Sequence, residues 1–571
     1  MALTRNKIIK DATNAYIQSL NKTNLPTPEE MEEQLLEKVN LQIETENAVR
    51  AKNAKLKLLT ELDEEQVAEL MAEFYPIVTI SCAGNSSDPK YDLLAIYQDT
   101  GEDEGTYVTS ELEIRKVAQR FKRYITNKDF DNLISQLRLK VPRLTRTIDR
   151  NLIAVNNGIF DYKAKQLLPF SSNYVFLTKS HVNYNPSAKN KTIHNNKDNT
   201  DWDVESWMDE LSDDPEIVEL LWQILGAIIR PNVRWNKSAW FYSESGNNGK
   251  GTLCELMRSL CGETAYAAIP LSSFGKDFAL EPLTKATAII VDENDVGIFI
   301  DKAANLKAVI TNDVIPINRK FQTPISYQFF GFMVQCLNEF PRIKDKSDSF
   351  YRRQIFIPFT KSFTGHERKY IKDDYLHRKD VLEYVMFKVL NMDYYELNEP
   401  QACLDVLSEY KEFNDPVRQF WEETSGMFQW DCLPYTFLYD LYRAWAKRFN
   451  PSGSLQGKQK FNLELRNIVA KDNGWTFNQN NDPIRVSHMM DAPETLIYEY
   501  DLQNWMNQGY NGKDINKICT TKAPALTRGL IRINSIKPGN ALYEDVISAR
   551  ENSDMIIDMP TEEVISNEDP D

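Results

Sequence analysis

The chain has 571 residues, a formal net charge of −16, a hydrophobic fraction of 42% and a charged fraction of 26%. Its length exceeds what one hydrophobic core supports, so several domains are expected. The acidic surplus argues against a protein that coats nucleic acid with its whole surface, because such binders cluster Lys and Arg. It leaves room for a local basic path.

No stretch approaches the roughly 20 apolar residues needed to cross a bilayer, and the first ten residues lack the apolar core of a secretory signal. A cytoplasmic protein without membrane contact is therefore expected. The seven cysteines form no C-x-x-C pair and only five histidines are present, which fits neither a zinc ribbon nor a disulfide framework. Reduced, mostly buried thiols are expected.

Residues 1–72 are charged and predicted to be helical. Thr27, Pro28 and Glu30 give a helix-start signature, with a capping threonine, proline at the first helical position and a glutamate three residues after the cap. The segment is either a solvated helical appendage or an arm for docking or oligomerisation.

A mixed α+β domain is predicted to follow at residues 73–199. The runs Ile77–Ser81 and Leu93–Tyr97 have the composition of strands and precede helical stretches that reach Leu139. Two short strands are expected around Gly158. Further on, an apolar helix over Ile217–Ile229 ends before a proline.

A phosphate-binding loop is the strongest single motif. Ser238–Ser243 reads as a buried strand, Glu244–Gly249 as a tight loop and Lys250–Cys261 as a helix. In such a loop, backbone N–H groups face an anion, the helix N-terminus adds its positive end and a lysine reaches the outer phosphates. The predicted nucleotide-binding residues are Gly246, Asn247, Asn248, Gly249, Lys250, Gly251 and Thr252.

This loop departs from the usual P-loop at two positions. Glu244 stands where the first glycine is expected, and Gly251 stands where Ser or Thr would bind magnesium. Thr252, one residue later, is the candidate replacement. On its own the loop is also compatible with a structural turn.

Polar residues end two further apolar strands. Ala286–Val291 precedes Asp292 and Glu293, and Gly331–Leu337 precedes Asn338. Carboxylates at the carboxyl end of such a strand suit a magnesium ligand and a water-orienting base, so Asp292 is assigned to the metal and Glu293 to the attacking water. Asn338 could hold the same water or the terminal phosphate.

Basic residues mark two more sites. A predicted hairpin within Leu306–Pro324 carries Arg319 and Lys320 at its tip, which could bind backbone phosphates without reading sequence; the alternative is a solvated turn. Arg352 and Arg353 precede an apolar strand, and either could stabilise charge on a phosphoryl group held by another subunit.

With these elements, the chain resembles the superfamily three helicases, in the phage and mobile-element branch related to poxvirus primase-helicases. The matching motifs are N-N-G-K-G-T at 247–252, I-I-V-D-E-N at 289–294, L-K-A-V-I-T-N-D at 306–313, C-L-N at 336–338 and Y-R-R-Q-I-F-I-P-F at 351–359. The resemblance covers residues 153–363 well and the flanks more weakly.

The resemblance implies an α/β fold with an AAA+ P-loop core, a homohexamer, ATP and Mg²⁺ as cofactors, 3′ to 5′ movement on single-stranded DNA, and a bacterial host cytoplasm. It implies Lys250 on phosphate, Asp292 on magnesium, Glu293 as base and Asn338 as sensor. Lys307 would reach a neighbour's nucleotide, and Lys320 would touch DNA. Before Tyr91 no metal-binding D-x-D and no zinc spacing is present, so priming activity is not expected.

The C-terminal part is predicted to form a winged-helix-like domain. Leu433–Arg448 and Lys458–Lys471 read as helices, and Trp475–Phe477 could begin a β-wing. Lys458 and Lys460 are the candidate DNA contacts of the second helix. Alternatively, the aromatic residues of the first helix belong to the hydrophobic core and the two lysines belong to a solvent-exposed face.

The expected domains are a charged helical arm (1–72), a mixed α+β domain (73–199), the motor (200–365), a helical segment (366–414), the winged-helix-like domain (415–500) and an extension with an acidic tail (501–571). The predicted function is an ATP-dependent DNA helicase that acts on single-stranded and forked DNA. The alternatives are an initiator that binds origin duplex DNA and recruits a host helicase, and an AAA+ protein remodeller.

Overall fold

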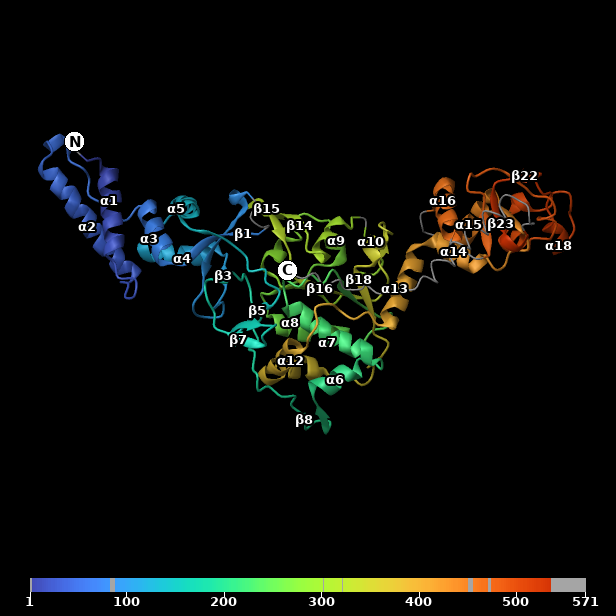
Figure 1. The fold of residues 1–571 in the computed structure, drawn as a ribbon, viewed down its shortest axis with the longest axis horizontal. Coiled ribbons are helices and arrows are strands. Elements are labelled where there is room, and N and C mark those ends of the chain that lie inside the picture. The colour runs from blue at the N-terminus through green and yellow to red at the C-terminus, as the bar shows by residue number, and fades with distance from the viewer. Residues whose placement is uncertain are drawn as a thin grey trace, which may run out of the picture. The chain divides into compact units, whose positions relative to one another are not determined.

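The computed structural model describes residues 3–82, 88–300, 302–320, 322–449, 455–470 and 474–535 (Figure 1). The chain divides into two compact units, residues 1–408 and 409–571. Among the described residues, no helix has both the length and the apolar character that a membrane crossing requires. All seven cysteines are buried and free, as expected.

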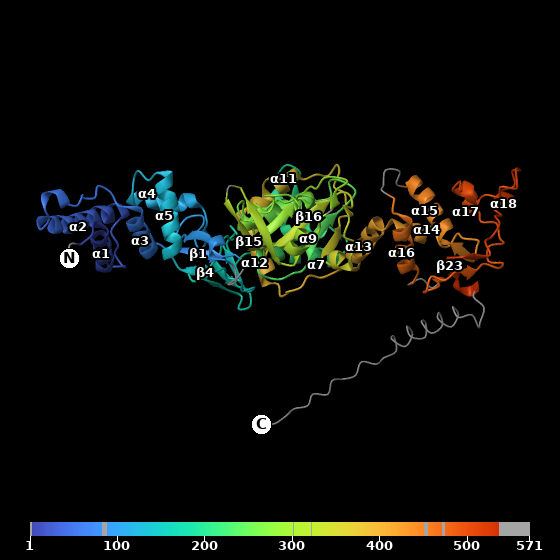
Figure 2. The ribbon, with the colours of Figure 1, turned by 90° about the horizontal axis from the view of Figure 1, so that it is seen from above.

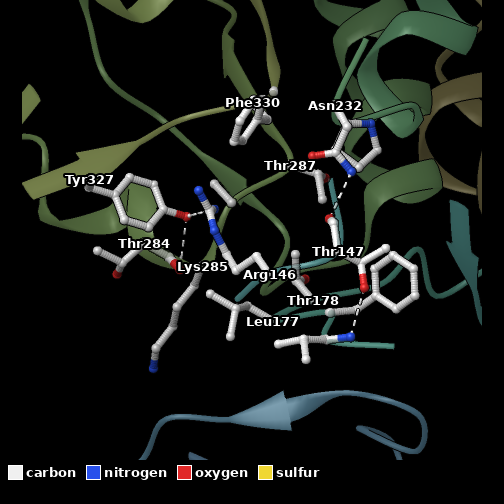
Figure 3. Close-up of a pocket in the computed structure, with 15 residues that line it drawn as sticks. Arg146, Thr147, Leu177, Thr178, Asn232, Thr284, Lys285, Thr287, Tyr327 and Phe330 are labelled. Carbon is white, nitrogen blue, oxygen red and sulfur yellow. Dashed lines mark hydrogen bonds between the residues drawn. The ribbon is translucent and has the colours of Figure 1, made fainter. Parts of the chain in front are cut away.

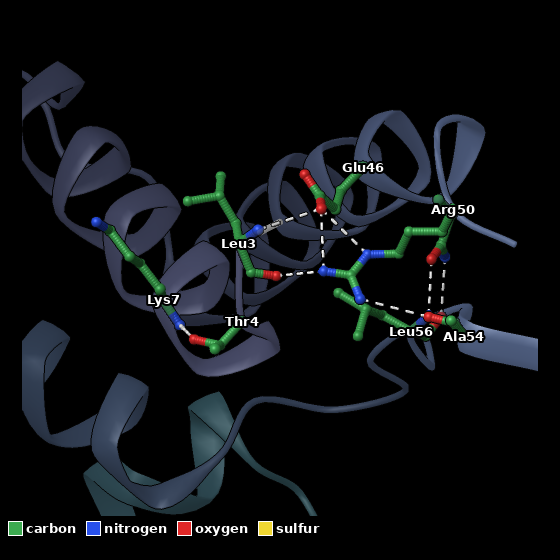
Figure 4. Close-up of polar contacts among 8 residues, drawn as sticks. Leu3, Thr4, Lys7, Glu46, Arg50, Ala54 and Leu56 are labelled. Carbon is green, nitrogen blue, oxygen red and sulfur yellow. Dashed lines mark hydrogen bonds and ion pairs between the residues drawn. The ribbon is translucent and has the colours of Figure 1, made fainter. Parts of the chain in front are cut away.

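The first unit begins with three helices. The predicted start at Thr27 is confirmed, because its side chain accepts from Glu30 N while Glu30 caps Thr27 in return. Arg50 links the end of the second helix to the residues just before the first. It forms an ion pair with Glu46 at 2.9 Å and donates to the carbonyl of Leu3 (Figure 4). The helices are α1 (Arg5–Ser19), α2 (Pro28–Ala48) and α3 (Glu64–Phe74).

These helices share one hydrophobic core with the residues that follow. Leu35 of α2 and Leu70 of α3 are fully buried in the same cluster as Leu133, and α1 and α2 lie side by side in both views (Figures 1 and 2). The expected boundary at residue 72 therefore runs through α3. The elements that follow are β1 (Ile77–Ser81), β2 (Leu93–Tyr97), β3 (Tyr107–Val108), α4 (Glu111–Phe121), α5 (Asn127–Lys140) and β4 (Arg143–Thr145), and the sheet order is β3-β2-β1-β4.

A small antiparallel sheet connects this region to the central part of the first unit. The expected strands on either side of Gly158 are present, and a third strand extends the sheet. A two-stranded ribbon follows. The elements are β5 (Leu152–Val155), β6 (Gly158–Asp161), β7 (Gln166–Leu168), β8 (Ile193–Asn195) and β9 (Thr200–Trp202).

The centre of the first unit is a five-stranded parallel sheet of order β11-β12-β16-β10-β18. Its long strands are apolar and buried along almost their whole length, as is typical of parallel strands covered on both faces. Helices α7, α8 and α12 pack together against one face (Figure 1). The strands are β10 (Ser238–Tyr242), β11 (Tyr266–Ala267), β12 (Ala288–Val291), β16 (Phe332–Leu337) and β18 (Gln354–Pro358).

The helices and the hairpin around this sheet follow the sequence pattern. Helix α7 ends at Ile229, and α8 ends before Gly262, which adopts φ +94°. The predicted hairpin is confirmed as β14 (Val314–Arg319) paired with β15 (Gln322–Gln328). The other elements are α6 (Val204–Glu210), α7 (Pro215–Ile229), α8 (Lys250–Cys261), β13 (Phe299–Ile300), α9 (Ala304–Ile310), β17 (Arg342–Ile343), α10 (Asp348–Tyr351), α11 (Lys369–Asp373), α12 (Lys379–Asn391) and α13 (Gln401–Asn414).

The second unit combines helices α14 to α16 with a three-stranded antiparallel sheet of order β19-β23-β20 (Figure 2). Phe437, Leu441 and Trp445 are core residues, each at most 2% exposed. Strand β23 completes the sheet, so the core extends past the expected boundary at residue 500. The acidic tail lies outside the described residues. The elements are α14 (Pro416–Thr424), β19 (Cys432–Pro434), α15 (Tyr435–Phe449), α16 (Lys458–Val469), β20 (Trp475–Phe477), β21 (Ile484–Arg485), α17 (Leu496–Glu499), α18 (Ile515–Ile518), β22 (Leu526–Thr527) and β23 (Gly529–Arg532).

Candidate nucleotide-binding site

The glycine-rich loop joins the carboxyl end of β10 to the first turn of α8. Gly249 caps α8 with φ +88°, and a Cβ at this position would lie 2.7 Å from Leu211 Cδ2. The positive φ therefore favours glycine, and a larger residue would also have to displace the end of the Leu211 side chain. Asn247 also adopts a positive φ of 53°, a conformation that Asn tolerates better than most residues. The loop thus turns sharply and presents the N-terminus of α8.

Lys250 is the first residue of α8, and it is only 5% exposed. Its Nζ donates to the carbonyls of Ser243 at 3.3 Å and Leu337 at 3.1 Å, and to Asn338 Oδ1 at 2.9 Å. Burial lowers the pKa of Lys250. All three acceptors are uncharged, so a buried ammonium lies at the carboxyl edge of the sheet where an anion would stabilise it. The structure brings Lys250 and Asn338 together.

The acidic pair lies at the end of β12, two strands from the loop. Asp292 forms an ion pair with Arg258 of α8 at 2.7 Å, and Arg258 also contacts Glu255 at 2.9 Å. Burial pushes the pKa of Asp292 upward, but the hydrogen bond and charge of Arg258 outweigh this and hold the pKa below its ordinary value. Glu293, the next residue, is exposed.

Asn294 is a structural residue of this edge that the sequence analysis missed. It is 5% exposed, accepts from Leu271 N at 3.0 Å, and donates to Gln335 Oε1 at 2.9 Å and to Cys336 O at 3.1 Å. These bonds tie the end of β12 to β16. The sequence signal for this role is an amide side chain directly after two carboxylates, at the point where an apolar strand ends.

Asn247 and Gly249 of the loop line a cavity of about 350 Å³. Asn247 Nδ2 donates to Glu367 Oε1 at 3.1 Å, and Asn247 O accepts from Phe363 N at 2.8 Å. Asn248 is buried and donates to Ser245 O at 2.5 Å. Gly249, Thr252 and Phe363 all line this cavity, which lies beside the loop.

The two predicted magnesium ligands are of the chemical type that magnesium prefers. Thr252, in the first turn of α8, and Asp292 offer a hydroxyl and a carboxylate oxygen, and Mg²⁺ is usually held by one or two such ligands together with water and substrate phosphates. Within the described part of the chain, no group of three or more His, Cys, Asp or Glu forms an all-protein metal site. Any magnesium here would depend on the phosphates for the rest of its ligands.

The two candidate arginines differ in their surroundings. Arg353 donates to the hydroxyl of Ser349 at 2.8 Å and to the carbonyl of the same residue, and burial lowers its pKa. Arg352 is exposed. Lys307 of α9 forms an ion pair with Asp345 at 2.6 Å, so its ammonium already has a partner within the chain.

The predicted DNA contacts are found at two separate places. Lys320 is exposed at the end of the hairpin, whereas Arg319 is half-buried beside it, and burial lowers the pKa of Arg319. In the second unit, Lys458 and Lys460 are exposed in the first turn of α16, and Lys460 lies 3.6 Å from Glu464.

Three family models match separate segments of the chain. A D5 N-terminal-like model matches residues 11–213, a family of unknown function, DUF5906, matches residues 241–353, and a poxvirus D5 protein-like model matches residues 412–507. The chain is similar to D5-type proteins on both sides of the glycine-rich loop. These matches support the relationship to phage and poxvirus primase-helicases that the motifs indicated. The model of unknown function spans the P-loop, the acidic pair and both arginines.

No curated protein matches the chain. Two solved structures of the NrS-1 C-terminal region are similar to it at 13% sequence identity. One, an A-form apo structure, has a TM-score of 0.39 and covers 78% of this chain and 91% of that chain. The other, also apo, has a TM-score of 0.36 and covers 71% of this chain and 87% of that chain.

Proposed function

We propose that this protein is an ATP-dependent DNA helicase that serves the replication of a phage or mobile genetic element. The observation that carries the proposal is the buried ammonium of Lys250, which has only uncharged acceptors and lies at the N-terminus of α8. A site that holds a cation with only uncharged acceptors at a helix N-terminus is suited to an anion such as the phosphates of ATP.

The chemistry follows from the residues around Lys250. The loop amides and Lys250 would bind the phosphates, and Asn338 would position the attacking water. Glu293 is exposed beside the site and would accept the proton of that water as its oxygen attacks the γ-phosphorus and ADP leaves. Thr252 and Asp292 would hold Mg²⁺, which neutralises phosphate charge when bound.

The sheet order supports an AAA+ motor. Strand β16 lies between the P-loop strand β10 and the acidic strand β12, so three strand ends deliver Lys250, Asn338 and Asp292 to one edge. Arg352 is exposed and could serve a nucleotide on a neighbouring subunit, which supports a closed homo-oligomer, a hexamer by family resemblance. Lys307 would reach the same nucleotide only by leaving Asp345.

The second unit supports DNA engagement. Its elements follow in the order α14, β19, α15, α16, β20 and β23, with the three strands in one antiparallel sheet, which supports a winged-helix-like domain. Helix α16 exposes Lys458 and Lys460 in its first turn, where they could contact phosphates. Lys320 at the hairpin would supply a second DNA contact.

The deciding experiment measures ATP hydrolysis by the full chain with and without single-stranded DNA, with Glu293→Gln as the control variant. We expect strong stimulation by DNA and its loss in the variant. Hydrolysis that is indifferent to DNA would contradict the motor and favour an initiator or a remodeller. A forked substrate separates these further, because only a motor unwinds a long duplex.

A further inference from the structure

A second cavity, of about 530 Å³, lies between the N-terminal sheet and the hairpin. We call it the basic cleft. Its walls come from the start of β2, the start of α4, the side of α5, the 3-10 helix Glu281–Lys285 and the hairpin strand β14. Segments that are far apart in the sequence therefore meet around one opening.

Four basic side chains line the basic cleft: Lys90, Arg138, Lys285 and Arg319. The acidic residues that line it are Asp92, Glu111 and Glu281.

The charges in the basic cleft do not cancel. The side chain of Asp92 is only 1% exposed and forms an ion pair with Arg143 at 2.6 Å, and Arg143 does not line the cleft. Lys90 likewise forms an ion pair with Asp88, which does not line the cleft, at 3.2 Å. Three basic residues, Arg138, Lys285 and Arg319, then remain beside two acidic ones, Glu111 and Glu281. Burial lowers the pKa of Arg319, and the positive charge of Arg138 adds to this effect while Glu281 opposes it. An anion in the cleft would relieve this repulsion.

Outside the basic cleft, Arg146 links the hairpin to the N-terminal sheet, and Figure 3 shows its hydrogen bond to Tyr327. Its guanidinium donates to Tyr327 Oη at 2.9 Å and Gln328 O at 2.5 Å on β15, and to Cys82 O at 3.3 Å after β1. Gln328 N also donates to Cys82 O at 3.2 Å. The hairpin and the N-terminal sheet are thus joined by several hydrogen bonds, which would limit the reorganisation that binding in the cleft requires.

We propose that the basic cleft binds the phosphodiester backbone of single-stranded DNA that passes the hairpin tip. The proposal rests on the proposed helicase function, in which Lys320 contacts the same strand. None of the described residues that line the cleft is aromatic, so it offers phosphate contacts and no stacking platform for bases. Arg138 donates to Asp92 O at 2.9 Å, which orients the guanidinium, and the planar group has further N–H donors for a phosphate.

The test is DNA affinity as a function of salt, measured by anisotropy with a labelled oligothymidylate and the full chain. The double variant Arg138→Ala/Lys285→Ala removes two cations of the cleft. The matched control, Lys163→Ala/Lys189→Ala, removes two exposed lysines elsewhere in the first unit. Single strands lose about 0.7 in the slope of log K against log salt for each phosphate contact, so we expect the slope to fall by about 1.4 in the cleft variant.

We also expect the cleft variant to bind DNA roughly tenfold more weakly at moderate salt, and the control variant to bind like the wild type. Arg138→Lys should retain most of the affinity, because it keeps the charge. Equal effects in the cleft and control variants would overturn the proposal. The proposal would also be overturned if the cleft variant released a labelled free nucleotide while its DNA affinity stayed unchanged. The variant Lys320→Ala distinguishes failure of the cleft proposal from failure of the proposed helicase function. If Lys320→Ala binds DNA weakly and the cleft variant binds it normally, the cleft proposal fails and the helicase proposal stands. If both variants bind DNA normally, the proposed DNA path past the hairpin fails as well.

Discussion

Replacing Lys250 by methionine should separate nucleotide binding from folding. The three hydrogen bonds of Nζ go to uncharged acceptors, and losing each costs about 1 kcal/mol. Against this, a buried ammonium without a charged partner carries a desolvation penalty, and methionine removes it. We therefore expect the free energy of unfolding of the nucleotide-free protein to change little or to rise.

The same substitution should abolish stabilisation by ATP. At a ligand concentration 100 times Kd, binding adds about 2.7 kcal/mol to the stability of the wild type, and the variant should gain almost none of it. Thermal melting of both proteins with and without MgATP measures this, alongside ATP hydrolysis. Because the folded-state pKa of Lys250 lies below its ordinary value of 10.5, the unfolded wild type binds the extra proton between the two pKa values. Its stability should therefore gain with rising pH in that window, and the Met variant should lack this gain.

Two results would refute this reasoning. Retained ATP-induced stabilisation in Lys250→Met would show that the loop does not bind the phosphates through this lysine. A loss of more than about 3 kcal/mol in the nucleotide-free variant would show that Lys250 is chiefly a structural anchor of the sheet edge, since that loss exceeds the sum of its three hydrogen bonds.

Three further predictions concern Asn294 and Asp292 at the carboxyl edge of the sheet and the two arginines that precede β18. Asn294→Ala should lower the free energy of unfolding by about 3 kcal/mol in urea titrations, because it leaves buried polar groups unpaired; a loss below about 1 kcal/mol would contradict this. Arg352→Ala should reduce DNA-stimulated ATP turnover by about 1,000-fold with unchanged melting, while Arg353→Ala should lower the melting temperature; the reverse pattern would exchange their roles. The lowered pKa of Asp292 adds stability that is present above its ordinary pKa of 3.8 and is lost as pH falls through the folded-state pKa, so Asp292→Asn should melt with a weaker acid dependence than the wild type below about pH 4.

The elements around the P-loop were predictable because each has a strong local signal. Strand β10 is a continuous apolar run, helix α8 begins at Lys250 and ends before a glycine, and β12 and β16 stop at polar residues. The hairpin and the capping box at Thr27 were equally local. In these segments the backbone requirement and the side-chain pattern lie within about ten residues of each other.

The boundaries at residues 72 and 500 could not be read in this way, because the cores there are assembled from distant segments. Val67 packs in one cluster with Phe130, and Cys432 shares a core with Ile531. A change of composition along the chain marks where charge or polarity shifts. It does not reveal which helix a later strand will cover.

The hydrogen-bond and ion-pair partners of the site residues could not be predicted from the sequence either. Arg258 follows Lys250 by two turns of α8, and nothing local indicates that it pairs with Asp292 on another strand. The different surroundings of Arg352 and Arg353 likewise needed coordinates, since only the structure shows that the guanidinium of Arg353 donates to Ser349. Such pairings depend on strand order, which fixes which ends meet.

These internal pairings suggest how the proposed site would respond to nucleotide. Without it, Lys250 contacts Asn338, and Asp292 contacts Arg258. A bound phosphate would compete with Asn338 for Lys250, and a magnesium held by Asp292 would compete with Arg258 for its carboxylate. Both exchanges alter contacts among α8, β12 and β16 without requiring the sheet to move. In the proposed function, ATP binding would release Asn338 to hold the attacking water and would free Arg258 to reorganise beside Glu255.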